Sequence, residues 1–183
     1  MTCSEAGLFR PGAWAAALAT AGPTSPSRMD VVTRADGVTV INDAYNANPD
    51  SMRAGLQALA WMARPESGGR RRRSWAVLGE MAELGDDTIS EHDRIGRLVV
   101  RLDVSRLVVV GTGRALGAMH QGAVMEGSWG AEATRVDDAD AALALLRAEL
   151  GPGDVVLVKA SNSAGLAALA RSLVDPADGA APR

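Results

Sequence analysis

The sequence has a single cysteine and no long apolar run, and both absences narrow the classes of protein to consider. Cys3 has no partner for an internal disulfide bond, which favours a reducing compartment, so we expect a cytoplasmic location. The most apolar stretches, such as residues 107–110 and 155–158, have the length of a buried strand. Spanning a bilayer takes roughly 18 apolar residues or more, so we expect no membrane span.

An excess of positive charge is also missing. Lys and Arg number 19 against 22 Asp and Glu, which gives a net charge of -3. Proteins that bind nucleic acids neutralise the phosphate backbone with basic residues, so we expect no nucleic-acid partner. The one basic run, residues 70–73, is interpreted as a solvated loop without an assigned role.

The sequence lacks the motifs that cradle a phosphate chain. No G-x-x-x-x-G-K-[ST] occurs, so the chain alone is not expected to hydrolyse ATP. Residues 111–117 read G-x-G-x-x-x-G, which departs from the dinucleotide fingerprint G-x-G-x-x-G. Of the two histidines, we interpret His92 as neutral and structural and His120 as a surface residue, and we assign no metal ligand.

What the sequence does contain is a regular alternation of strands and helices within one core. Residues 30–34 and 38–42 flank Ala35-Asp36-Gly37 and predict an antiparallel hairpin. Further strands are expected at 74–78, 106–110, 134–136 and 154–158, and helices at 49–63, from 88, at 114–125, from 137 or 138, and at 164–174. The pattern predicts a Rossmann-like α/β fold, with a mostly parallel sheet covered by helices on both faces.

Two helix starts carry capping signals. Asn48 is the expected N-cap of a helix whose first residue is Pro49, and residues 88–91 read as a capping box. The Pro- and Ser-containing stretch 22–27 marks a linker, so residues 1–27 are expected to be an attachment. Residues 28–175 form the expected domain, and 176–183 a loose tail.

Ligands of open α/β sheets gather at the carboxyl ends of the strands, where four loops should open on one edge. These loops comprise residues 43–49, 79–85, 111–114 and 159–162. Asp43 suits ribose hydroxyls, although it could equally stabilise its own turn. Lys159 and Ser161 could receive a carboxylate, although a lysine that ends a strand is solvent-exposed by default. Glu80 and Glu83 could work as an acid/base pair or hold a metal. They could also recognise a substrate amine, or be solvated or turn-stabilising loop residues.

Three segments in this order resemble the last domain of the Mur ligase family. They are residues 43–52, DAYNANPDSM, residues 76–85, AVLGEMAELG, with Glu91-His92 following, and residues 153–159, GDVVLVK. The resemblance is to the members that join D-alanyl-D-alanine to UDP-MurNAc-tripeptide during peptidoglycan synthesis, and it covers about residues 28–174.

The resemblance implies a three-domain, ATP-dependent ligase of which only the last domain is present. A first domain would bind the UDP sugar, a central P-loop domain would bind most of ATP and Mg²⁺, and the last domain would close over the nucleotide and position the amino substrate. Residues 1–27 would be the end of the central domain and its linker. No catalytic residue is assigned within this chain.

Carried over residue by residue, the resemblance implies two sets of binding residues. The nucleotide set comprises Arg28, Asp43, Tyr45 and Asn46. The amino-substrate set comprises Asn48, Glu83, Lys159 and Ser161. Ala160 and Asn162 depart from the glycine and arginine usual in the family, which weakens the carboxylate assignment there.

Two other interpretations remain open at this point. The chain could be a stand-alone Rossmann-like nucleotide-binding module, such as a dehydrogenase, although the broken glycine fingerprint argues against it. It could also be a non-catalytic domain that binds a partner.

Overall fold

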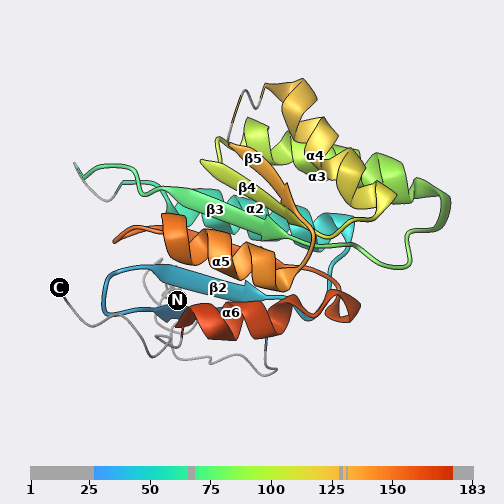
Figure 1. Cartoon of the computed structure of the whole chain (residues 1–183). Coiled ribbons are helices and arrows are strands. Elements are labelled where there is room, and N and C mark those ends of the chain that lie inside the picture. The colour runs from blue at the N-terminus through green and yellow to red at the C-terminus, as the bar shows by residue number, and fades with distance from the viewer. Residues whose placement is uncertain (1–26, 66–68, 128–129, 131, 175–183) are drawn as a thin grey trace, which may run out of the picture.

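The protein, described here from a computed structural model, is built on a six-stranded sheet (Figure 1). The structure describes residues 27–65, 69–127, 130 and 132–174, so the expected attachment, apart from Ser27, and the expected tail lie outside the described residues. The strands lie in the order β1-β2-β6-β3-β4-β5. Their bounds are β1 Asp30–Thr33, β2 Thr39–Asp43, β3 Ser74–Leu78, β4 Arg106–Val110, β5 Ala133–Val136 and β6 Val155–Lys159.

The expected hairpin and parallel sheet are both confirmed. β1 pairs antiparallel with β2, with Val32 opposite Val40, and every other neighbouring pair is parallel. Gly37 closes the hairpin with a φ of 85°, a conformation that favours glycine because it has no Cβ. The hairpin therefore adds one antiparallel edge strand to a parallel sheet.

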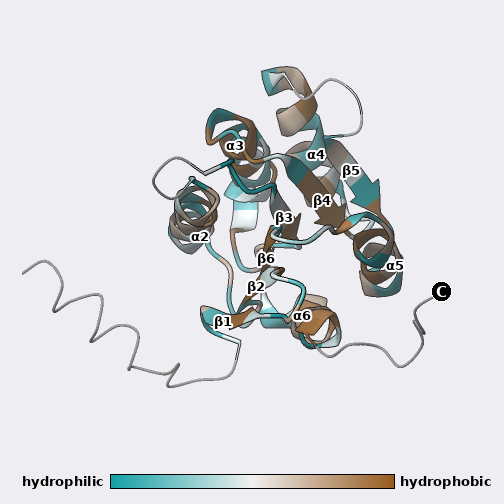
Figure 2. Cartoon of the chain, turned by 90° about the vertical axis from the view of Figure 1, so that its left-hand side faces the viewer, coloured by the Kyte–Doolittle hydropathy of each residue, from teal (hydrophilic) through white to brown (hydrophobic). Residues whose placement is uncertain are grey.

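Helices cover both faces of this sheet. α2 (Pro49–Met62), α3 (Thr88–Arg101) and α4 (Arg114–Glu126) lie on one face, and α5 (Ala139–Glu149) and α6 (Leu166–Val174) on the other (Figure 2). Short 3-10 turns, η1 (Gly85–Asp87) and η2 (Asn162–Ala164), precede α3 and α6. None of the described helices is long and apolar enough to cross a membrane.

The central strands show why the fold needs two helical layers. All five residues of β3 and all five of β6 are buried. Along β3 the side chains alternate, so that Ala76 and Leu78 join the core beneath α2, α3 and α4, whereas Trp75 and Val77 join the core beneath α5 and α6. Strands that are buried on both faces read as continuous apolar runs, and the sequence shows such runs at these strands.

The capping box expected at residues 88–91 is wrong, although a helix does begin there. Asp87 and Thr88 both have right-handed helical backbone angles because η1 runs directly into α3. An N-cap residue needs extended backbone geometry, which Thr88 therefore cannot supply. Its hydroxyl instead donates to the carbonyl oxygen of Gly85, at 2.7 Å, and ties the 3-10 turn to the helix.

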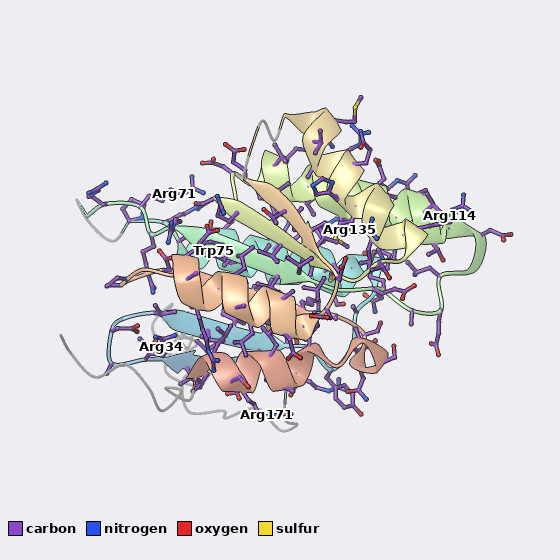
Figure 3. All side chains as sticks on the ribbon, in the orientation of Figure 1. Arg34, Arg71, Trp75, Arg114, Arg135 and Arg171 are labelled. Atoms are coloured by element: carbon purple, nitrogen blue, oxygen red, sulfur yellow. The ribbon has the colours of Figure 1, made fainter. Side chains whose placement is uncertain are left out.

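Residues 70–73 lie in a loop, as expected, and residues 70, 71 and 73 are exposed. The interpretation is incomplete in one respect, because two of these arginines bond to the sheet. Arg72 donates to the carbonyl oxygen of Gly153 at 2.6 Å and to the hydroxyl of Thr39 at 2.8 Å. Arg73 forms an ion pair with the buried Asp154 at 2.7 Å. These arginines join β2, β3 and β6 at the amino ends of the strands, where Arg71 and Trp75 are labelled in Figure 3.

Trp75 completes this structural cluster. Its indole N–H donates to Asp154 at 2.9 Å, and the guanidinium groups of Arg73 and Arg106 lie over its ring, 4.9 and 5.1 Å from the centroid. The basic run therefore has a structural role at the edge opposite the carboxyl ends of the strands.

Candidate functional site

The carboxyl ends of the parallel strands bring the candidate loops to one edge, as expected. Asp43 of β2 and Leu78 of β3 are both in register with Lys159 of β6, which lies between them. Backbone bonds then join the loops, because Gly79 N–H donates to the carbonyl oxygen of Lys159 and Ser161 N–H donates to that of Glu80. The loops of residues 79–85 and 159–162 are thus connected, and the loops of residues 43–49 and 111–114 lie on either side of them along one rim.

Three hollows lie along this rim. The Asp43 groove, of about 460 Å³, is lined by Arg28, Met29, Asp43, Asn46, Asn48, Ser51, Ala54, Gly55 and Lys159. The Glu83 hollow, of about 350 Å³, is lined by Tyr45, Asn46, Ala82, Glu83, Ser161, Asn162 and Ser163. The Gly113 hollow, of about 490 Å³, is lined by Glu80, Val110, Gly111, Thr112, Gly113, Leu116, Asp137, Asp138, Ala139 and Ala164.

An ion pair lies at the wall of the Asp43 groove. The ammonium of Lys159 donates to Oδ2 of Asp43 at 2.5 Å and to the carbonyl oxygen of Asn46 at 3.0 Å. The other carboxylate oxygen of Asp43 accepts the backbone N–H of Met29 at 3.1 Å. An ammonium has three N–H donors, and the described residues supply acceptors for two of them. Lys159 also lines the groove.

Lys159 is 1% exposed, contrary to the solvent exposure that a strand-terminal lysine suggests. Its aliphatic stem passes α2 at Gly55, where a Cβ would lie 3.2 Å from the lysine Cδ. A glycine inside a helix costs about 1 kcal/mol relative to alanine, so its presence here calls for a packing reason. Sequence reasoning missed this link, although a glycine within the apolar pattern of 49–63 was a visible signal.

Arg28 and Tyr45 form the outer end of the site. The Arg28 guanidinium lies over the Tyr45 ring, 4.2 Å from its centroid, and both side chains are exposed. Arg28 precedes Met29, whose backbone N–H is held by Asp43. The four residues of the nucleotide set are therefore brought together, because Arg28 lies over Tyr45 and lines the Asp43 groove with Asp43 and Asn46.

Asn48 is confirmed as the N-cap of α2. Its side-chain oxygen accepts the N–H of Ser51 at 2.8 Å, and the Ser51 hydroxyl accepts the N–H of Asn48 at 3.0 Å. Pro49 occupies the first helical turn, as expected. Asn48 also lines the Asp43 groove, so the cap holds one wall of the groove in place.

Ser161 fastens the Glu83 hollow to its neighbours. Its buried hydroxyl accepts the N–H of Ala82 at 2.9 Å and lies 3.5 Å from the carbonyl oxygen of Ala47, to which it donates. Glu83, one residue after Ala82, has a φ of 64° and an exposed side chain. A left-handed non-glycine residue is strained, and such residues often occur at functional sites.

His92 holds the same loop from the other side. It is fully buried, its Nε2 accepts the N–H of Met81 at 3.0 Å, and its Nδ1 lies 2.7 Å from the carbonyl oxygen of Thr88. Burial lowers the pKa of His92, and this effect outweighs the opposing bond to Thr88 and the charges of Glu80 and Glu91. Its neutral structural role is confirmed, whereas the expected surface residue His120 is only half-exposed, with Nε2 3.2 Å from the carbonyl oxygen of Ala133.

The two residue sets do not form two separate pockets. The Asp43 groove contains Arg28 and Asp43 of the nucleotide set together with Asn48 and Lys159 of the amino-substrate set. Within the described ranges no group of three or more His, Cys, Asp and Glu side chains is placed to hold a metal ion.

Comparisons with known proteins show the family of the chain. The family model for the Mur ligase, glutamate ligase domain, matches residues 27–162. The UDP-N-acetylmuramoyl-tripeptide–D-alanyl-D-alanine ligase of Mycobacterium leprae is 70% identical over 166 residues, covering 87% of this chain and 32% of the relative. The same ligase of Mycobacterium tuberculosis strain H37Rv is 72% identical over 172 residues, covering 87% of this chain and 33% of the relative.

Solved structures show the same fold. A crystal structure of MurF from Acinetobacter baumannii, 26% identical, gives a TM-score of 0.67 and covers 83% of this chain and 31% of that one. MurF from Thermotoga maritima in complex with ADP, 24% identical, gives a TM-score of 0.61 over 82% of this chain and 30% of that one. The chain spans about a third of the length of the mycobacterial relatives. It belongs to the Mur ligase family, whose carboxy-terminal domain it comprises.

Proposed function

We propose that this chain is the part of an ATP-dependent ligase that closes over the nucleotide and positions D-alanyl-D-alanine for addition to UDP-MurNAc-tripeptide. The ion pair of Asp43 and Lys159, in a groove that also contains Arg28 and the α2 N-cap, is the observation that carries the proposal. The names of the mycobacterial relatives supply the two substrates. ATP is the nucleotide that the family resemblance implies.

On the nucleotide side, Asp43 accepts ribose hydroxyls and Arg28 approaches the phosphates. A carboxylate held by Lys159 and by the Met29 N–H is fixed in orientation before a ligand arrives. Stacking on Tyr45 holds the Arg28 guanidinium at the mouth of the groove, where its charge attracts an anion. Asn46 lines both the groove and the Glu83 hollow, and so joins the two substrates' sites.

On the amino-substrate side, Lys159 and Asn48 line the groove, while Glu83 and Ser161 line the adjoining hollow. A dipeptide has one ammonium and one carboxylate. Glu83 suits the ammonium and Lys159 suits the carboxylate, because each meets a group of opposite charge. The two groups of a dipeptide could thus bind in the adjoining hollows.

The phosphorylating step belongs to domains upstream of the described residues. The sequence has no P-loop, so ATP, Mg²⁺ and the tripeptide carboxylate would meet in a central domain, and UDP-MurNAc would bind further upstream. No metal ligand is proposed among the residues described here. A cytoplasmic location is part of the proposal and rests on the lone cysteine of the sequence.

The test is a chimaera in which residues 27–174 replace the matching third of the M. tuberculosis relative. Arg28→Ala should raise the KM for ATP about tenfold or more and leave that for D-alanyl-D-alanine unchanged, because a charge-assisted contact contributes about 1.5–3 kcal/mol. Glu83→Gln should do the reverse. Arg53→Ala, on the exposed surface of α2, is the matched control and should change neither constant. Equal effects of Arg28→Ala and Glu83→Gln on both constants would contradict the assignment.

A further inference from the structure

We infer that His92 is a positioning residue, which holds the loop of residues 79–85 so that Glu83 is displayed in its hollow. The inference rests on the proposed role of Glu83 toward the substrate amine. His92 itself is fully buried in α3 and does not line the Glu83 hollow. It would therefore act through the backbone of the loop.

The hydrogen bonds of the ring fix its tautomer. A carbonyl oxygen only accepts, so the contact with Thr88 requires a proton on Nδ1. The N–H of Met81 only donates, so Nε2 must carry a lone pair. The ring is consequently neutral with its proton on Nδ1, and it joins the first turn of α3 to the loop.

Successive backbone groups of the loop are then held from two sides. From β6 and its following loop, Lys159 accepts the N–H of Gly79, and Ser161 binds the carbonyl oxygen of Glu80 and the N–H of Ala82. Among the described residues, only His92 holds the N–H of Met81, which lies between them. Without that acceptor, a buried N–H would be left unsatisfied and the loop would have to move.

Glu83 comes immediately after these fixed groups and has the left-handed backbone geometry described above. Strained conformations persist where the surrounding structure enforces them. The bonds to Met81 and Ala82 supply that constraint on the amino-terminal side of Glu83. Loss of the His92 bond should therefore change how Glu83 is presented, with little effect on the Asp43 groove.

The kinetic test compares two substitutions in the chimaera. His92→Leu removes the acceptor, whereas His92→Gln places a neutral oxygen near the position of Nε2. His92→Leu should raise the KM for D-alanyl-D-alanine about fivefold, the effect of losing one hydrogen bond, and leave the KM for ATP unchanged. His92→Gln should restore most of the loss. His120→Gln, at the second histidine of the chain, which is half-buried, should change neither constant.

A structural readout on the 183-residue chain tests the same inference without turnover. Nitrogen NMR should find Nδ1 protonated and Nε2 unprotonated, and exchange of the Met81 amide should accelerate in a folded His92→Leu variant but not in His92→Gln. An Nε2-protonated ring, or a folded His92→Leu variant with an unchanged KM for the dipeptide where Glu83→Gln raises it, would overturn the inference. An unchanged KM in Glu83→Gln would instead remove the proposed amine site, and with it the functional part of the inference.

Discussion

The ammonium of Lys159 lies 2.5 Å from Oδ2 of Asp43, although 116 positions separate the two residues in the sequence. The contact exists because β2 and β6 are adjacent, parallel and in register at their last residues. It joins one residue that the family resemblance places on the nucleotide side to one that it places on the amino-substrate side. Substitutions of these two residues are therefore expected to affect both substrates.

The effects of substituting Asp43 and Lys159 on the free energy of unfolding should be strongly coupled. Asp43→Asn leaves a buried ammonium without its counter-ion, and we expect the free energy of unfolding to fall by about 3 kcal/mol. Lys159→Met should also destabilise the chain, while the double variant should recover part of the loss, because neither charge is then left alone. Urea unfolding of the four proteins measures this coupling. Asp50→Asn, whose ion pair with Arg53 is exposed, should cost less than about 1 kcal/mol. Additive effects of Asp43→Asn and Lys159→Met would contradict the coupling.

Asp154→Ala should lower the free energy of unfolding by about 3 kcal/mol. It leaves the Trp75 indole N–H and the Gly151 N–H, at the amino ends of the strands, without their acceptor. Arg73 also loses its counter-ion. Arg70→Ala, in the same basic run and exposed, should leave the free energy of unfolding nearly unchanged. Thermal and urea unfolding compare the two variants. Equal losses would contradict the structural role assigned to the bonds of Asp154.

Close packing of α3 against α4 depends on glycine. A Cβ on Gly96 would lie 1.9 Å from the carbonyl oxygen of Met119, so Gly96→Ala must push the two helices apart. The free energy of unfolding should fall by about 3 kcal/mol or more. A Cβ on Gly113 meets nothing within 4 Å, and Gly113→Ala should cost less than about 1 kcal/mol. Denaturant unfolding of both variants tests the difference, and a tolerated Gly96→Ala would show that the helices can separate at little cost.

The stability of the chain should depend on pH through His92. The pKa of His92 is lowered in the folded state. Below about pH 6.5, His92 therefore binds a proton in the unfolded chain but not in the folded chain. The free energy of unfolding should therefore fall as the pH falls from about 6.5 toward the folded-state pKa, and be independent of this group above about 6.5. Unfolding of the original chain and of His92→Gln between about pH 5.5 and 8 isolates the effect. Equal slopes in the two proteins would contradict it.

Much of the fold could be predicted from local patterns. The Asp-Gly hairpin, the Asn48 cap and the all-apolar central strands are decided by residues close together in the chain, and the structure confirms them. The start of α3 was harder to predict, because the preceding 3-10 turn changes the backbone angles of Thr88. No pattern within residues 88–91 reveals that turn.

The contacts of the candidate site depend on distant residues, and these were less accessible from the sequence. The carboxyl edge could be predicted from strand order, but the burial of Lys159 requires knowing that Gly55 of α2 lies beside it. The contacts of Arg72 and Arg73 become visible only when the amino ends of β2 and β6 are placed next to them. A single sequence does not specify these long-range neighbours.

Reconstitution of ligation tests the central claim most directly. The upstream two-thirds of the M. tuberculosis relative should be inactive alone, and so should the 183-residue chain, which lacks a P-loop. When the two are fused at residue 27, joining of D-alanyl-D-alanine to UDP-MurNAc-tripeptide should appear, with phosphate released from ATP. A folded fusion that binds ATP but forms no product, or ligation by the upstream fragment alone, would contradict the account.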